Sequence, residues 1–162
     1  MTRINSAISV KNLTDEHLLA EHREIKRLPY ILKQAINSGS IKNIPSKFTL
    51  GKGHILFFLD KMYFTLSRYS DIHAELLVRG FDVEMYYDNW DSVHFKYSNN
   101  YTPTEEERQL LIDRITERIM NSPKKVWHYY GEPITQEEAV KLLTKNWHHF
   151  GKPKEIMKRL RN

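Results

Sequence analysis

The 162-residue chain has no cysteine, no apolar run as long as about 18 residues, and no repeat or low-complexity tract. The missing cysteines exclude a disulfide framework, a zinc site built on thiolates and catalysis by a cysteine nucleophile. The missing apolar run argues against a transmembrane helix, and polar residues near the start argue against a signal peptide. We therefore expect one soluble domain, without a membrane partner and large enough for a real core.

Positive charge is in modest excess, with a net charge of +5 and an isoelectric point near 9.3. Residues 1–60 carry nine Lys and Arg against five Asp and Glu, whereas residues 82–107 carry one against seven. Residues 152–162 carry five against one. A polyanionic partner would meet the two basic ends, and residues 82–107 would face away from it. Ordinary solvated faces are the alternative interpretation.

Residues 1–12 are predicted to form an extended arm, and a helix is predicted to begin at Thr14 or Asp15. Its apolar residues recur at helical spacing: Leu18, Ile25, Leu28, Leu32 and Ile36. Pro29 removes one backbone donor within this stretch, but the apolar spacing continues beyond it. We therefore expect a kink there, and an end at Gly39.

Three further helices are predicted after a loop over residues 40–54. The second has an apolar stripe from Ile55 to Leu76 and should end at Gly80. The third should begin at Thr102 with a capping box to Glu105, and end at 121–123. A short fourth helix should run from Thr135 to about Asn146. We expect the aromatic residues of 81–101 to pack as loops, and those of 127–130 to pack against the core, with a wedge into DNA as the alternative.

These patterns predict an all-α fold of three main helices packed side by side. Long loops would connect them, the N-terminal arm would pack against them, and residues 135–162 would form a helical, basic C-terminal extension. We expect no metal or other cofactor, because no His-x-x-x-His pair with a third ligand stands on one helix.

The N-terminus and the first helix carry the candidate chemistry. Thr2 is small enough for Met1 to be removed, which would leave a free α-amine with a pKa of about 7.7–8, so that a useful fraction is neutral and nucleophilic at pH 7. Glu24 could serve in acid–base steps. Arg23 and Arg27, four residues apart on one side of the helix, could bind phosphates.

Several segments resemble one family in the same order and at nearly the same spacing: MTRIN, HLLAEHREIKR, LGKGH, FFLDK, RGF and WHYYG. The chain is similar over about residues 1–134 to the phage-type pyrimidine-dimer DNA glycosylases with AP lyase activity, the repair enzymes of the endonuclease V kind. Residues 135–162 lie outside this resemblance. It implies an all-α fold and damaged double-stranded DNA as the partner. It also implies that the protein acts as a monomer in the reducing interior of a host cell, in the cytoplasm or at the nucleoid. A viral origin is compatible with these expectations.

The resemblance also implies an imine mechanism. The Thr2 amine would attack C1′ of the damaged nucleotide, with Glu24 assisting, and β-elimination would then cut the strand. Substrate contacts would come from Arg3, His17, His22, Arg23, Arg27, Gly51, Gly53, His54, Arg114 and Arg118. The run Tyr129 to Gly131 also matches the family's placement, and Arg118 replaces a lysine, which keeps the charge. Position 22 is His in this chain, whereas the best-known member has Tyr. We expect this difference to affect the lesion preference more than the lyase chemistry.

Two other functions fit the same residues. One is a DNA-binding protein without enzymatic activity on the same scaffold, and the other is a related glycosylase for another lesion or for abasic sites only. Each residue also has a structural explanation by itself. A glutamate beside arginines, such as Glu24, commonly forms a surface ion pair.

Overall fold

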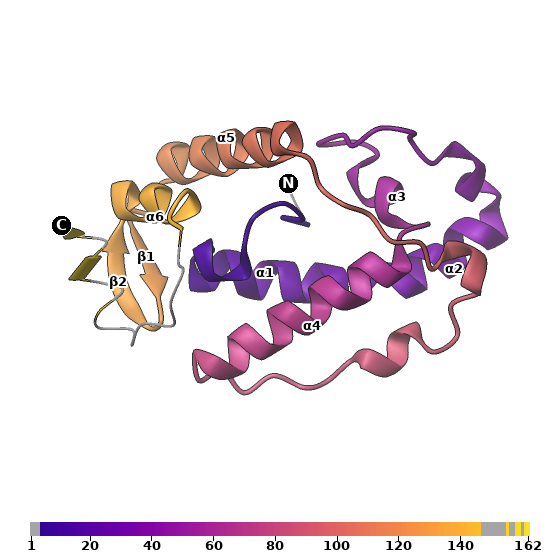
Figure 1. Ribbon diagram of the computed structural model, residues 1–162, viewed down its shortest axis with the longest axis horizontal. Coiled ribbons are helices and arrows are strands. Elements are labelled where there is room, and N and C mark those ends of the chain that lie inside the picture. Colours follow the sequence, from indigo (N-terminus) through magenta and orange to yellow (C-terminus); the bar gives the residue numbers. More distant parts are fainter. Residues whose placement is uncertain (1–3, 147–154, 156–157, 160) are drawn as a thin grey trace.

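The computed structural model describes residues 4–146, 155, 158–159 and 161–162. It is mostly helical with one small antiparallel sheet, which confirms the predicted all-α class (Figure 1). The elements, with η for short 3-10 helices, are η1 (Val10–Asn12), α1 (Asp15–Ile25), α2 (Leu28–Ser38), η2 (Ser40–Asn43), α3 (His54–Phe58), α4 (Met62–Val78), η3 (Tyr87–Trp90), η4 (Phe95–Tyr97), α5 (Glu105–Asn121), β1 (Val126–Tyr129), β2 (Glu132–Thr135) and α6 (Gln136–Leu143).

The first predicted helix is two helices, and the expectation of one kinked helix is wrong. α1 ends at Ile25 and α2 begins at Leu28, with a turn at Lys26 and Arg27 between them. Pro29 has no N–H to donate to the Ile25 carbonyl, and its ring crowds that oxygen. The apolar spacing continues because both helices bury the same side, and this spacing hides the break.

The second predicted helix is also divided, into α3 and α4. Lys61, which precedes α4, leaves helical geometry with φ −121° and ψ 44°. Its backbone pairs with Ser98 in an isolated antiparallel bridge, and its ammonium donates to the Phe57 carbonyl over 2.7 Å. The loop before α5 therefore takes the backbone groups that a continuous helix would have used.

α5 begins two residues later than predicted. Its capping box joins Thr104 and Glu107, not Thr102 and Glu105. Both pairs have the three-residue spacing of a capping box, so the motif alone does not choose between them. The helix ends at Asn121, as expected.

A β-hairpin, which the sequence analysis did not predict, occupies residues 126–135. Trp127 lies opposite Ile134 in the antiparallel register. The two residues of the turn, Tyr130 and Gly131, have φ of 53° and 76°, the geometry that suits a two-residue hairpin turn. Next, α6 starts at the predicted cap, Thr135, and buries the apolar side chains of Ala139, Leu142 and Leu143.

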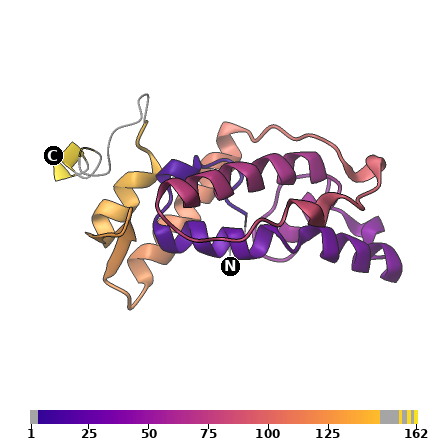
Figure 2. The same cartoon turned by 90° about the horizontal axis from the view of Figure 1, so that it is seen from below.

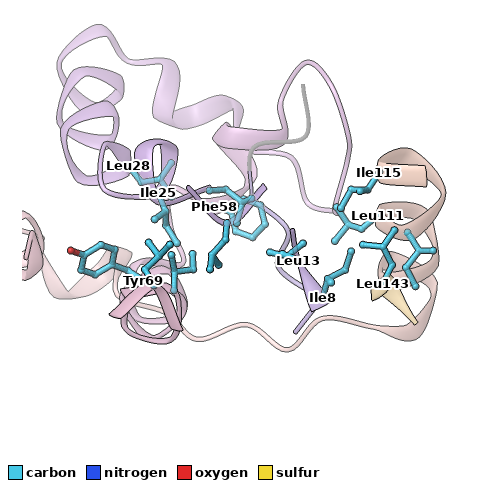
Figure 3. Close-up of a cluster of buried hydrophobic side chains, with 14 of the residues drawn as sticks. Ile8, Leu13, Ile25, Leu28, Phe58, Tyr69, Leu111, Ile115 and Leu143 are labelled. Carbon is cyan, nitrogen blue, oxygen red and sulfur yellow. The ribbon is translucent and has the colours of Figure 1, made fainter. Parts of the chain in front are cut away.

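The N-terminal arm runs through the middle of the core. Figure 3 shows Ile8 and Leu13 of the arm between two groups of apolar side chains. On one side lie residues of α1 and α4, such as Ile25 and Tyr69, and on the other lie Leu111 and Ile115 of α5. The predicted packing of the arm against the helices is confirmed, since Ile4, Ile8 and Leu13 are at most 1% exposed.

The acidic segment 82–107 begins against the C-terminal end of α1: the Tyr86 ring lies 6.0 Å from that of His22, and the Asn89 amide donates to the Lys26 carbonyl over 2.8 Å. In Figure 1 residues 82–90 run along the side of α4 that faces away from α5 and the chain then turns toward α2, and in Figure 2 residues 98–104 follow the edge opposite α1. As expected, several of its aromatic residues pack inward: Trp90 is 7% exposed and stacks on Tyr69. Phe95 is an exception, at 81% exposed. Among the described helices none is long and apolar enough to span a membrane.

Candidate active site and DNA-binding surface

The start of the arm is held by His54, which lies at the first position of α3. The Ile4 N–H donates to His54 Nε2 over 3.2 Å, and His54 Nδ1 lies 2.9 Å from the Thr49 carbonyl oxygen. A ring with its proton on Nδ1 satisfies both of these bonds, and Nε2 also lies 3.2 Å from the Ile4 carbonyl oxygen, to which it would donate in the other tautomer. Burial lowers the pKa of His54, which favours a neutral ring.

Gly53 allows this arrangement. Its φ of 92° is unfavourable for other residues, and an added Cβ would lie 3.4 Å from Pro45 Cγ. The turn over 51–53 thus places His54 against the arm. Gly51 and Gly53 also line a surface groove of about 760 Å³ together with Asn43, Pro45, Lys52 and His54.

A buried ion pair holds the next part of the arm. Arg68 of α4 binds Glu21 of α1 through two nitrogens, at 2.9 and 3.1 Å. The Asn5 amide donates to Glu21 Oε2 over 2.9 Å, and Arg68 Nη1 donates to the Ile8 carbonyl over 2.6 Å. Arm, α1 and α4 therefore share one network.

The far end of the arm, at residues 10–13, is also held by hydrogen bonds. The guanidinium of Arg79 donates to the carbonyls of Val10 and Leu13 and to Asp15. The Asn12 amide donates to the carbonyls of Leu143 and Lys145, just after α6. The arm is thus anchored from α1, α3, α4 and the C-terminal end of α6.

Of the predicted catalytic pair, Thr2 lies outside the described residues, as does the predicted phosphate contact Arg3. Glu24 is on α1, one turn beyond Glu21, with 22% of its side chain exposed. Arg27 Nη1 lies 3.9 Å from Glu24 Oε2, and Arg23 and Arg27 are both exposed. One turn of α1 therefore carries a half-buried carboxylate with two accessible guanidiniums.

His17 lies at the boundary between α1 and the hairpin. Its ring stacks on Trp127 with centroids 5.0 Å apart, and Nδ1 lies 2.8 Å from the hydroxyl of Thr14, the cap of α1. Burial, followed by the nearby charges of Arg118 and Lys124, lowers the pKa of His17 to about 4. Arg118 and Arg114, one turn earlier, both lie on α5 and are half-buried.

His22 lies in the core, apart from the other candidates. It is 5% exposed, and its ring contacts Tyr69, His73 and Tyr86. Burial, with the nearby charges of Lys26, His73 and Arg23, lowers its pKa to about 4. A DNA contact by this ring would require the aromatic cluster to open, whereas Arg23 beside it is exposed.

The run Tyr129 to Gly131 connects the hairpin to the body. The N–H groups of Tyr130 and Gly131 donate to the Asp15 carboxylate, the Tyr130 hydroxyl donates to Glu75, and the Tyr129 hydroxyl donates to the Lys11 carbonyl. These contacts give the run a structural role in the folded chain.

Asn5, Glu21 and Arg68 were missed by the sequence analysis. A signal was available, because Glu21 falls on the helical stripe of Leu18 and Ile25, and Arg68 beside Tyr69 and Ile72. A charged residue on an apolar stripe indicates a buried pair whose partner lies elsewhere in the chain. Among the described residues, no three His, Asp or Glu side chains lie close enough to hold a metal ion.

Comparison with known protein families shows to which family this chain belongs. The family model described as pyrimidine dimer DNA glycosylase matches residues 1–89, more than half of the chain. The match includes the arm, α1 to α4, Glu24 with its two arginines and the network around Glu21. Members of this family are DNA repair enzymes, and their substrate is DNA. The chain belongs to the pyrimidine dimer DNA glycosylase family.

Proposed function

We propose that this protein removes pyrimidine dimers through an imine formed by the α-amine of Thr2, after removal of Met1, and then cuts the strand as an AP lyase. The observation that carries the proposal is the anchoring of the arm at its start: Ile4 binds His54, and Asn5 binds Glu21, one turn before Glu24 on α1. A nucleophile at a chain terminus has little value unless the terminus is held in place.

Chain geometry supports the choice of nucleophile. Two residues span at most about 7 Å, so an amine on Thr2 starts within that distance of the anchored Ile4 nitrogen. Asn5 binds Glu21, and Glu24 follows Glu21 by one turn, a rise of about 4.5 Å. The amine and the Glu24 carboxylate are therefore within reach of one nucleotide.

The chemistry proceeds in two stages. The neutral amine forms a bond to C1′ as the bond between C1′ and the base breaks, and the sugar ring then opens to an imine. Glu24 stabilises the cationic sugar and afterwards moves protons. Loss of the 2′ proton expels the 3′ phosphate, which cuts the strand, and water hydrolyses the imine to release the enzyme.

DNA binding uses the exposed charges near this point. Arg23 and Arg27 on α1 would hold phosphates, with Arg3 from the arm and with Arg114 and Arg118 from α5. C1′ is shielded in a regular duplex, so a nucleotide must leave the stack, which costs a few kcal/mol and is easiest at a damaged step. Distortion at a dimer thus contributes to specificity.

The test is a duplex with one pyrimidine dimer, compared with undamaged and abasic duplexes. We expect cleavage on the 3′ side of the lesion, leaving an unsaturated aldehyde end, in the presence of EDTA as well as in its absence. An intact strand after tight binding would favour a non-enzymatic binding protein. Cleavage of the abasic duplex alone would indicate a different lesion range, and alkali-labile but uncut sites would exclude the lyase step.

A further inference from the structure

The ion pair between Glu21 and Arg68 is deeply buried, like that between Arg79 and Asp15. The two side chains are 0% and 7% exposed. Removing two charges from water costs several kcal/mol for each, and a buried pair seldom stabilises a fold more than apolar residues of the same size. Stability alone therefore does not account for this pair.

The hydrogen bonds that remain to the pair go to the arm. Asn5 donates its side-chain amide to Glu21, and Arg68 donates to the carbonyl of Ile8. The Ile8 N–H in turn donates to the Asn5 carbonyl over 3.0 Å, which closes a tight turn. The ion pair thus holds both ends of one turn, and His54 holds Ile4 just before it.

We propose that Glu21 and Arg68 are positioning residues for the N-terminal amine: by holding both ends of the turn from Asn5 to Ile8, they set how far the arm extends toward Glu24. The proposal rests on the imine function proposed above. A slip of the arm by one residue would move the amine by about 3.5 Å. A misplacement of about 1 Å can already slow a reaction by about 100-fold.

Two variants separate positioning from folding. The double variant Glu21→Met with Arg68→Met replaces the pair by apolar side chains of similar length, so that no charge is left buried without a partner. The single variant Asn5→Ala removes one bond to the arm and leaves the pair itself intact. Thr65→Val is the matched control, because Thr65 is a buried polar residue of α4 that donates to Met62 of its own helix and accepts from Trp90, away from the arm.

Two measurements are needed for each variant. Hydrogen exchange of the Ile4 and Ile8 amides reports whether the arm is held. Borohydride trapping on an abasic duplex, under single-turnover conditions and well below the melting temperature, reports the rate of imine formation, and the Kd for the same duplex is measured separately.

We expect the double variant and Asn5→Ala to exchange the arm amides faster and to trap at least about 10-fold more slowly, at an unchanged Kd. Thr65→Val should behave as the wild type in both measurements. Wild-type exchange in Asn5→Ala and in a folded double variant would overturn the proposal, and so would wild-type trapping rates in variants whose arm is loose. If the wild-type protein formed no N-terminal adduct, the proposed function would fail. Arm exchange would still decide whether the pair holds the turn: faster exchange supports that role and unchanged exchange refutes it.

Discussion

Mild acid should destabilise the fold through His22. This ring is 5% exposed, and its Nε2 has no hydrogen-bond partner among the described residues. Its pKa falls from 6.5 to about 4, so the unfolded chain binds a proton at a pH where the folded chain does not. The contribution to stability is therefore complete above pH 6.5 and is lost as the pH falls toward 4.

The size of the effect follows from these two values. A difference of about 2.5 pH units is equivalent to about 3 kcal/mol in total. At pH 5, between the two values, His22 alone should lower the free energy of unfolding by about 2 kcal/mol relative to pH 7.5. His17, with a similar pKa, should add a comparable loss.

Urea unfolding at pH 7.5, 6 and 5 measures the effect before most carboxylates are protonated. The variant His22→Phe should recover about 2 kcal/mol of the loss between pH 7.5 and 5. His94→Gln, at an exposed histidine, should have the same pH dependence as the wild type. An unchanged slope in His22→Phe would show that the buried ring takes up its proton without opening the core, and would refute this reasoning.

Three further predictions concern DNA. Glu24→Gln should lower single-turnover rates on a dimer duplex by about 100-fold or more while the Kd stays unchanged; full activity would reduce Glu24 to an ion-pair partner. Arg23→Gln and Arg27→Gln should each weaken duplex binding and reduce the slope of log Kd against log salt by about one phosphate contact, and a slope equal to that of the wild type would remove that arginine from the interface. Truncation after Gly151 removes five basic residues at 152–161. It should weaken binding to undamaged duplex, most clearly at low salt, and leave the cleavage rate at a bound lesion unaltered. Equal slopes of log Kd against log salt for the full and the truncated chain would mean that the tail is only a solvated end.

The sequence was sufficient for the fold class and for most helix ends that have a single chemical signal. Gly39 and Thr135 mark helix boundaries where the residue type admits one interpretation, and the structure agrees. Of the two starts expected for the first helix, Thr14 and Asp15, Thr14 is the cap. Where two capping boxes overlapped, at Thr102 and Thr104, local sequence had no means of choosing. The choice depends on how the preceding loop packs, which is a tertiary effect.

The breaks within the helices were harder to predict, because apolar spacing records burial and not hydrogen bonding. Leu28 and Met62 keep the stripe of the preceding helix although the backbone ladder is interrupted before each of them. The hairpin was missed because its four-residue strands are too short for a period of two to stand out.

The candidate site was predictable in its exposed part only. Arg23, Glu24 and Arg27 lie within five residues of sequence, and one turn of helix brings them together. The anchoring of the arm joins residues that lie 16 to 133 positions apart, such as Asn5 with Glu21 and Asn12 with Lys145. No spacing within one helix records such contacts, so the polar residues that hold the arm emerge only from the folded chain.

The central claim is that the amine at the start of the anchored arm attacks the sugar. The most direct measurement is mass spectrometry of the intact protein, and of its peptides, after borohydride reduction with an abasic duplex. We predict loss of Met1 and one adduct on Thr2, which should persist in Lys52→Arg, where the lysine beside His54 in the groove is replaced. An adduct on a lysine, or trapping by protein that retains Met1, would contradict the account.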